Sequence, residues 1–491
     1  MKFFKSSMIV TLGILISKAL SLIFIFPFSR IVGAVGIALY NYAYAPFLLI
    51  LELSTFGIPE ALSKLVGNKN SINEHVTAYR IFKKGLFLMI IFGIISFLLL
   101  NFIAPFYASY ALSNNSINKN ELINSIRILS ISLLIIPFTS GLKGFLQGNL
   151  EFLACSISQI VEQIIRVSLI LITTSLIINN GGSYINAIYW TLFSTIIAEF
   201  FSLLILYIFY KKKNIITSGY VFNISFKEIL TNSFPFFIYG ISISLFSFID
   251  SLFFSKGLTN YGISNPEYIY GIYSFEVLKL INIPLTIIIG IKTVLLPVIS
   301  NGTNTINKIN KALQIVFMIF IPIMFLTMLY SNEIYNLLYV HNEGGKILFV
   351  SSMLIPIMAL NSLLISIITG TNLDKFLYFP LLLGILFKFI TTYIFISYLS
   401  YSGAVLSSFI SYSLIILANI YILHKNKLLR YKFILKQFNR FSLISIIGII
   451  GLIIVKFILS GINEYLLLMI SLILYLFYYL YVTKKYHISI F

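Results

Sequence analysis

Charged residues are scarce in this sequence, and their scarcity excludes a water-soluble fold. Asp, Glu, Lys and Arg make up 10% of the 491 residues, whereas a soluble chain holds about 25%. Hydrophobic residues make up 59%, and the mean hydropathy is +0.98. Because so few polar groups cannot cover the surface of a protein this long in water, we expect lipid to surround most of it.

Cysteine and histidine are also sparse. The single cysteine, Cys155, lies in an apolar run, so no internal disulfide can form. The four histidines are far apart in the sequence and fall in loops or near the end of the chain: His75, His341, His424 and His487. We therefore predict no metal site, no cofactor and no catalytic residue.

What the sequence has in abundance is long apolar runs. A run of about 20 apolar residues crosses a hydrocarbon core of about 30 Å as a helix. Fourteen such runs follow one another, near 6–29, 36–58, 85–105, 126–147, 153–178, 185–209, 231–254, 269–297, 312–330, 347–370, 376–399, 402–423, 441–460 and 464–482. The pattern predicts an all-α polytopic membrane protein with about fourteen transmembrane helices. The first run contains Lys18 and no small-residue cleavage motif follows it, which favours a retained helix over a signal peptide.

The net charge of +19 reports membrane topology. With the N-terminus inside, nearly all lysines and arginines fall in cytoplasmic segments, and few beyond Arg30, Lys119, Lys256 and Lys346 fall on the other side. This asymmetry predicts that both termini are cytoplasmic and that the basic segments attract anionic membrane lipids. No stretch combines basic and aromatic residues as a nucleic-acid site does, so we predict no nucleic-acid partner.

A weak internal repeat suggests two halves. Eighteen residues separate Gly148 from Arg166, and eighteen separate Gly370 from Lys388. We expect an N-terminal six-helix lobe at 1–212, a pseudo-symmetric C-terminal lobe at 213–430 and two added spans at 431–491. Substrate sites of carriers built from such repeats lie at the interface between them, which favours a carrier over a structural membrane protein.

Ionisable residues within the spans are the candidate site. Each charge near a helix centre costs about 2.5–3.5 kcal/mol on the insertion scale, so these side chains should face protein or water. Those near or within the runs include Lys143, Glu199, Lys292 and Lys456. The residues that we predict to line a substrate cavity are Lys18, Arg30, Glu52, Glu162, Arg166, Asp250, Glu276, Lys279 and Lys388. Basic groups in such a cavity would attract an anion such as a diphosphate.

Two of these candidates have an equally good structural interpretation. Glu162 and Arg166 share one helix face with Gln159 and Gln163, and their i,i+4 spacing lets them neutralise each other. The face lines either a packing seam or a water-filled cavity. Lys279 has a similar alternative, an i,i+3 ion pair with Glu276.

Several motifs resemble a known family. They are "GIPEALSKLV" at 57–66, "SQIVEQIIRV" at 158–167, "PLTIIIGIKTVLLPVIS" at 284–300, and the segment at 374–412 that begins "DKFLYFPLLLGILFKFI". These resemble the oligosaccharide-lipid flippases of the multidrug/oligosaccharidyl-lipid/polysaccharide exporter superfamily. The similarity is greatest to the branch that holds stage V sporulation protein B and the lipid II flippases.

The resemblance implies a function. A member of this branch would carry an undecaprenyl-diphosphate-linked saccharide, most often the peptidoglycan precursor lipid II, from the inner to the outer leaflet of the bacterial cytoplasmic membrane by alternating access. It also implies that Lys18 and Lys279 stand where such flippases carry cavity arginines. The implied partners are the lipid-linked substrate, membrane lipids and proteins of cell-wall or polysaccharide synthesis.

Other interpretations stay open at this point. The saccharide could belong to a capsule, a teichoic acid or an exopolysaccharide, and a coupling cation is not assigned. A cation-coupled multidrug exporter of the same superfamily would have a more acidic pocket and twelve spans. A membrane enzyme acting on the same lipid would need a catalytic loop, for which the outer loops offer only Glu267, Glu333, His341 and Glu343.

Overall fold

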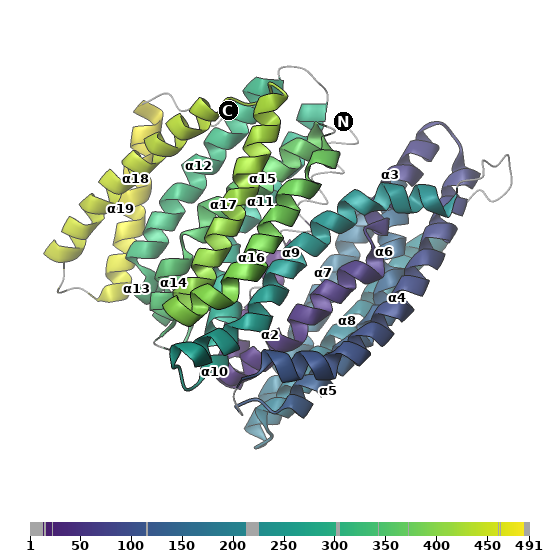
Figure 1. Ribbon diagram of the computed structural model, residues 1–491, viewed down its shortest axis with the longest axis horizontal. Helices are drawn as coiled ribbons and strands as arrows, with labels where there is room; N and C mark the ends of the chain where they lie inside the picture. The colour runs from purple at the N-terminus through teal and green to yellow at the C-terminus, as the bar shows by residue number, and fades with distance from the viewer. Residues whose placement is uncertain are drawn as a thin grey trace. The chain divides into compact units, whose positions relative to one another are not determined.

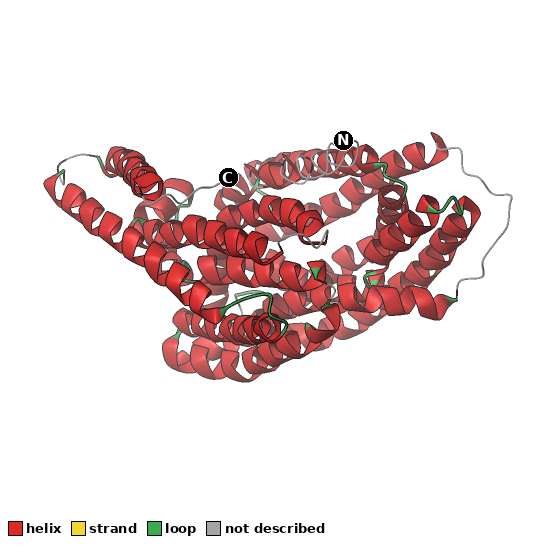
Figure 2. Ribbon diagram, turned by 90° about the horizontal axis from the view of Figure 1, so that it is seen from above, coloured by secondary structure: helices red, strands yellow, loops and turns green. Residues whose placement is uncertain are grey.

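A computed structural model describes residues 13, 16–21, 23–113, 116–212, 225–300, 305–341, 343–371, 373–459, 461 and 463–485. These residues form helices and connecting loops, with no strand among them (Figure 2). Their contacts divide the chain into two compact units, Met1–Gly271 and Ile272–Phe491. The predicted division at 212 and 430 stays a prediction about the repeats.

The first unit runs from the purple to the teal part of the ribbon in Figure 1. Its helices are α2 (Ile25–Thr55), α3 (Ile58–Ser71), α4 (His75–Ala111), α5 (Lys119–Ser130), α6 (Ser132–Gly148), α7 (Phe152–Asn179), α8 (Tyr184–Lys212), α9 (Phe226–Tyr261) and α10 (Pro266–Gly271). Where the sequence supplies a cap, a helix begins at it. The Asn118 side chain accepts from the Asn120 N–H at 3.0 Å before α5, and Ser225 accepts from the Glu228 N–H at 3.2 Å before α9.

The second unit runs from the teal-green part of the ribbon to the yellow end. It begins with a π-helix, η1 (Ile272–Val277), that connects α10 to α11. The helices that follow are α11 (Leu278–Ser300), α12 (Thr305–Leu329), α13 (Ser331–Leu338), α14 (Gly344–Ser351), α15 (Leu354–Gly370), the short 3₁₀ turn η2 (Asp374–Phe376), α16 (Tyr378–Leu399), α17 (Tyr401–Lys425), α18 (Tyr431–Ile458) and α19 (Glu464–Lys485). Helices α14 and α15 meet at a bend of 43°.

The predicted all-α polytopic fold is confirmed. Twelve helices of the described residues are long and apolar enough to cross a membrane, and the bent pair α14–α15 makes thirteen. Each coincides with one of the predicted runs from 36–58 onward. Of the predicted first run, 6–29, the structure describes residues 13, 16–21 and 23–29.

Two glycines turn the chain in the first unit. Gly33 has φ 70° and ψ 173°, which interrupts α2 between the predicted first and second runs. Gly57 has φ 64° at the break between α2 and α3, and a Cβ there would stand 2.6 Å from the Ser233 carbonyl oxygen of α9. Glycine adopts positive φ without steric cost, so both breaks are encoded by these residues.

Candidate functional site

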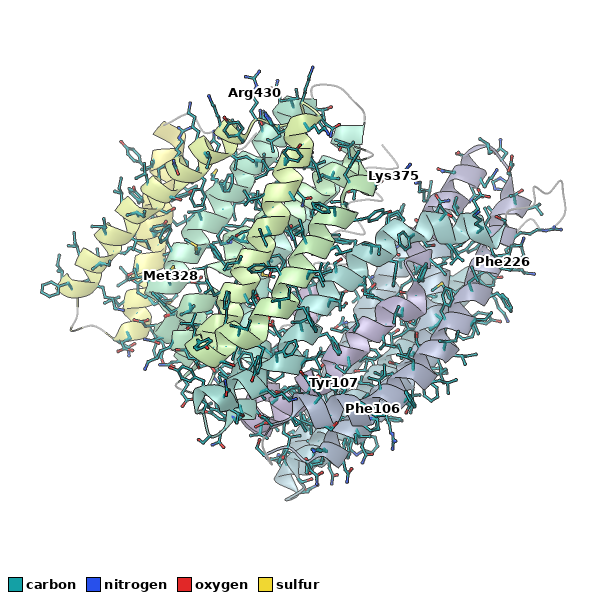
Figure 3. The ribbon with its side chains drawn as sticks, in the orientation of Figure 1. Phe106, Tyr107, Phe226, Met328, Lys375 and Arg430 are labelled. Atoms are coloured by element: carbon teal, nitrogen blue, oxygen red, sulfur yellow. The ribbon has the colours of Figure 1, made fainter. Side chains whose placement is uncertain are left out.

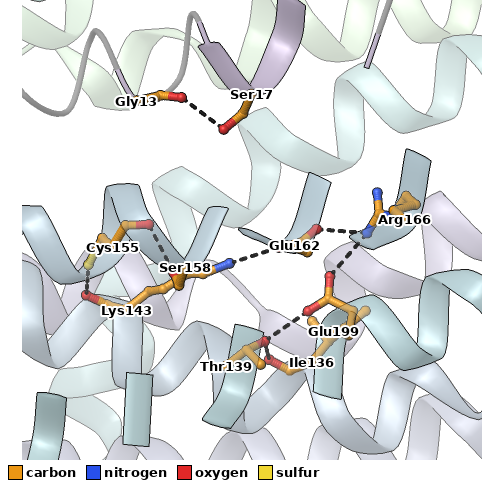
Figure 4. A network of polar contacts seen from close by, with 10 residues as sticks. All are labelled: Gly13, Ser17, Ile136, Thr139, Lys143, Cys155, Ser158, Glu162, Arg166 and Glu199. Carbon is orange, nitrogen blue, oxygen red and sulfur yellow. Dashed lines mark hydrogen bonds and ion pairs between the residues drawn. The ribbon is translucent and has the colours of Figure 1, made fainter. Parts of the chain in front are cut away.

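Four charged side chains meet inside the first unit and form what we call the charged cluster: Lys143 on α6, Glu162 and Arg166 on α7, and Glu199 on α8 (Figure 4). Glu162 is the central residue of the cluster because it contacts both cations. Its Oε1 lies 2.7 Å from Arg166 Nη2, and its Oε2 lies 3.5 Å from Lys143 Nζ. Arg166 Nη2 also lies 3.6 Å from Glu199 Oε1. Two cations and two carboxylates therefore balance within the cluster.

Hydroxyl groups extend the cluster to neighbouring helices. The Thr139 hydroxyl of α6 donates to Glu199 Oε2 at 3.4 Å. One turn earlier on the same face of α8, the Thr195 hydroxyl lies 3.0 Å from the Tyr44 hydroxyl and joins α8 to α2. The cluster thus lies in a polar seam where α2, α6, α7 and α8 pack against one another.

Burial indicates what this seam does. The charged side chains are between 9% and 19% exposed, so solvent reaches them only partly. A charge removed from water in this way costs free energy unless it is paired, and here each one has a partner of opposite sign. Of the two interpretations that the sequence left open, the geometry favours the packing seam. A role of Glu162 and Arg166 in substrate binding stays a prediction.

The other predicted site residues of the first unit lie apart from the cluster. Lys18 is exposed, and its ammonium makes no ion pair with any described residue. Arg30 is exposed near the Gly33 break, and Asp250 is buried on α9. The half-buried Glu52 carboxylate lies against the backbone of α9, where a Cβ on Gly240 would stand 2.1 Å from Glu52 Oε2.

A buried carboxylate also lies in the π-helix of the second unit. Glu276 is fully buried; it accepts a hydrogen bond from the Tyr335 hydroxyl, and His341 Nδ1 lies 3.1 Å from its Oε1. The Tyr339 ring lies 5.1 Å from that of Tyr335. Burial raises the pKa of Tyr339, and the Glu276 charge adds to this, so the phenol stays protonated. These contacts attach η1 to α13 and to the loop that follows it.

The two remaining predicted cations occupy different surroundings. Lys279 is half-buried, with its ammonium 5.8 Å from the centre of the Phe275 ring. Lys388 is fully buried between α16 and α17, and its Nζ donates to Ser408 Oγ at 2.7 Å and lies 3.5 Å from Ser407 Oγ. The Thr392 and Ser407 hydroxyls, 2.8 Å apart, complete this hydroxyl cage.

Sequence reasoning missed several of these partners. Lys143 and Glu199 were recognised as charges within spans but not as members of a site with Glu162. Tyr335, His341, Ser407 and Ser408 were not singled out as partners at all. Helix spacing shows which residues share a face on one helix, but not which residue of a neighbouring helix faces them. The sequence did offer one signal. Helices α7–α8 and α16–α17 are consecutive and joined by short loops, so the two helices of each pair are expected to pack side by side.

Comparison with known proteins gives the same fold. Along 98% of this chain and 99% of its own, the structure titled lipid II flippase MurJ, inward closed conformation, superposes with a TM-score of 0.73 at 18% identity. An inward-facing multidrug resistance MATE family transporter of the MOP superfamily superposes on 84% of this chain and 95% of its own, with a TM-score of 0.66 at 16% identity. At these identities the likeness shows the architecture.

Sequence comparison is more specific. The lipid II flippase MurJ of Bacillus subtilis (strain 168) is 29% identical and covers 94% of this chain and 90% of its own length. Stage V sporulation protein B of the same organism is 26% identical over 323 residues, which is 64% of this chain and 60% of its own. Residues 3–303 match the family described as polysaccharide biosynthesis protein. With more than half of its length matched, the chain belongs to the polysaccharide biosynthesis protein family.

Proposed function

We propose that this protein is a flippase that moves an undecaprenyl-diphosphate-linked saccharide, foremost lipid II, from the inner to the outer leaflet of the bacterial cytoplasmic membrane. The observation that carries the proposal is the similarity to the lipid II flippase MurJ of Bacillus subtilis, which extends over 94% of this chain and 90% of that protein. Only 6% of this chain lies outside that similarity.

The chemistry of the spans supports the proposal. Moving a diphosphate and a saccharide across hydrocarbon requires groups that replace water along the path. A lysine can do this as a compact point charge toward phosphate. We assign this role to Lys18 and Lys279, with Arg30 as a further cation. The protein would bind its substrate and change conformation by alternating access, without a chemical step, and both termini would lie in the cytoplasm.

Complementation tests the substrate. The full chain is expressed in bacteria depleted of their own lipid II flippase, and growth and peptidoglycan synthesis are measured. We expect rescue by the unaltered chain. Failure to rescue at normal membrane abundance would contradict lipid II as the substrate and favour another lipid-linked glycan.

Variants in the same assay test the cationic residues. Lys18→Ala and Lys279→Ala should lose rescue, whereas the exposed Lys119→Ala at the start of α5 should keep it. Membrane abundance is compared by immunoblot for all three variants. Full rescue by Lys18→Ala and Lys279→Ala would leave the function in place and remove these two lysines from the site.

A further inference from the structure

Three lysines lie over aromatic rings at one end of the first unit. The ammonium-to-ring distances are 4.7, 5.4 and 5.0 Å for the pairs Lys83–Tyr79, Lys84–Phe226 and Lys211–Tyr207. Figure 3 shows Phe226 at this end. We call these six residues the lysine–aromatic patch. In two of the pairs the ring and the lysine are four residues apart on one helix, so the two side chains lie next to each other on the same face.

Contacts between helices join the pairs into one surface. The Tyr79 hydroxyl of α4 lies 3.2 Å from the Tyr210 hydroxyl of α8, and the Tyr210 ring lies 6.3 Å from the Tyr207 ring. The Phe87 ring of α4 lies 6.2 Å from the Phe226 ring of α9. Helix α4 therefore carries the middle of the patch, with α8 and α9 on either side. Contacts between helices therefore hold the three lysine–ring pairs near one another, although only Lys84 rests on a ring of another helix.

Helix length sets the depth of the patch in the membrane. Helix α4 has 37 residues and is about 55 Å long, whereas the hydrocarbon core is about 30 Å thick. Its first three turns hold Arg80, Lys83 and Lys84, and the apolar run begins after them. These turns extend beyond the hydrocarbon into the headgroup layer, where tyrosine is enriched because its ring is apolar and its hydroxyl polar.

Three cations of this end are available to an anion. Arg80, Lys83 and Lys211 are exposed and form no ion pair with any described residue. The nearby Glu74 carboxylate is already paired with Lys69 at 2.8 Å. An ammonium that rests on a ring face keeps N–H donors on its other side. Because the rings already carry lysines, they are not open platforms for stacking nucleic-acid bases.

We propose that the lysine–aromatic patch binds the headgroup phosphate of an anionic phospholipid, such as phosphatidylglycerol, at the membrane surface. The ammonium groups of Lys83 and Lys211 bind the phosphate oxygens, Lys84 adds positive charge beside them, and the rings hold these groups at headgroup level. This site is independent of the proposed transport function, because its residues are not among those assigned to the transported substrate.

Binding of fluorescent phosphatidylglycerol to the detergent-solubilised full chain tests the site, with fluorescent phosphatidylcholine as the neutral lipid. A lysine near an anionic lipid surface contributes about fivefold in affinity. We expect the double variant Lys83→Gln/Lys211→Gln to bind phosphatidylglycerol about 25-fold more weakly, with no change for phosphatidylcholine. The matched control is Lys425→Gln/Lys432→Gln, which removes the same charge from exposed lysines of the second unit; it should change affinity less than twofold.

A second variant tests whether lipid binding depends on the rings that position the lysines or only on the net charge. Tyr79→Ala/Tyr207→Ala keeps every lysine but removes two rings, and we expect it to weaken phosphatidylglycerol binding about threefold. The proposal would be overturned if the Lys83/Lys211 and Lys425/Lys432 double variants lost phosphatidylglycerol affinity equally, or if neither lost any. So would displacement of the lipid by millimolar inorganic phosphate, which would indicate a site for a free anion. Retention of an acidic protein by the unaltered chain, without lipid selectivity, would also overturn it.

Discussion

Arg166 and Lys388 stand at matching places in the two units, each on the first helix of a hairpin and each eighteen residues after a glycine. Helices α7–α8 surround Arg166 with the carboxylates of Glu162 and Glu199. Helices α16–α17 surround Lys388 with the hydroxyls of Ser407 and Ser408. In the first hairpin, together with α6, side chains of opposite charge neutralise one another. In the second, neutral hydroxyl groups hydrogen-bond to the cation.

The two hairpins therefore accommodate a poorly solvated cation in different ways. In the first hairpin, losing one member leaves an uncompensated charge in a poorly solvated seam. In the second, the hydroxyl groups also donate to backbone or side-chain acceptors of their own: Thr392 to the Lys388 carbonyl and Ser408 to the Ala404 carbonyl. The two hairpins should therefore respond differently to equivalent substitutions.

The largest effect is expected for Arg166→Met. It leaves Glu162 with only the 3.5 Å contact to Lys143 and leaves the cluster with a net negative charge. Breaking a buried pair costs about 3–5 kcal/mol, and because these side chains are partly exposed we expect a loss of about 3 kcal/mol. Denaturant titration in mixed micelles measures it, with Trp190 on α8 as the fluorescent probe of the first unit. Arg166→Met/Glu162→Gln should recover most of the loss; a stable Arg166→Met protein would contradict the balanced cluster.

Ser408→Ala should have the next largest effect. It removes the 2.7 Å hydrogen bond to the buried Lys388 ammonium, and hydrogen bonds to charged groups contribute about 1.5–3 kcal/mol. Unfolding followed by circular dichroism measures the change. The control is Ser413→Ala on the same helix, whose hydroxyl bonds to the Phe409 carbonyl, and it should have little effect. If both variants lose equal stability, the cage does not support Lys388.

A smaller effect is expected for Glu199→Gln. Its contacts with Arg166 and Thr139, at 3.6 and 3.4 Å, are long, and the amide keeps an oxygen that can accept from either group. We expect a loss of about 1 kcal/mol, comparable to one neutral hydrogen bond. Glu162→Gln, measured by the same titration, should cost more because it weakens both cation contacts. The reverse order would place the centre of the cluster at Glu199.

The smallest effect is expected for Lys388→Met, the counterpart of Arg166→Met. The methionine side chain is unbranched and apolar, one atom shorter than that of lysine and of similar volume, and the hydroxyls of Thr392 and Ser408 keep their backbone acceptors. Replacement of a buried charge by a well-packed apolar residue is often close to neutral, so we expect a change within about 1 kcal/mol. A loss as large as that of Arg166→Met would remove the contrast between the two hairpins.

Hydropathy and helix length were sufficient to predict the spans, because the cost of exposing a polar backbone to lipid leaves few alternatives to a helix. The run at 347–370 shows where this reasoning stops. The sequence predicts one span there, and the structure bends it by 43° between Ser351 and Leu354. Pro356 lies four residues after Ser352 and has no N–H to donate to the Ser352 carbonyl, so the bend has a local cause in the sequence that hydropathy does not record.

The candidate site was predicted less completely than the fold. The i,i+4 pair Glu162 and Arg166 could be found because both residues belong to one helix. Their partners Lys143 and Glu199 come from helices whose rotation depends on packing, which one sequence does not determine. The lysine–aromatic patch shows both cases: Tyr79–Lys83 and Tyr207–Lys211 are visible as spacings in the sequence, whereas Lys84–Phe226 requires α4 and α9 to be side by side.

The π-helix η1 has a consequence for every residue that follows it in α11. A π turn takes up one residue more than an α turn, and one residue corresponds to about 100° of rotation. The side chains after Val277, including that of Lys279, therefore point about 100° away from the direction that an uninterrupted α-helix would give them. Deleting one residue within Ile272–Val277 would restore an ordinary helix and turn the rest of α11 about its axis. One surplus residue thus decides which way a whole transmembrane segment points its only lysines, Lys279 and Lys292.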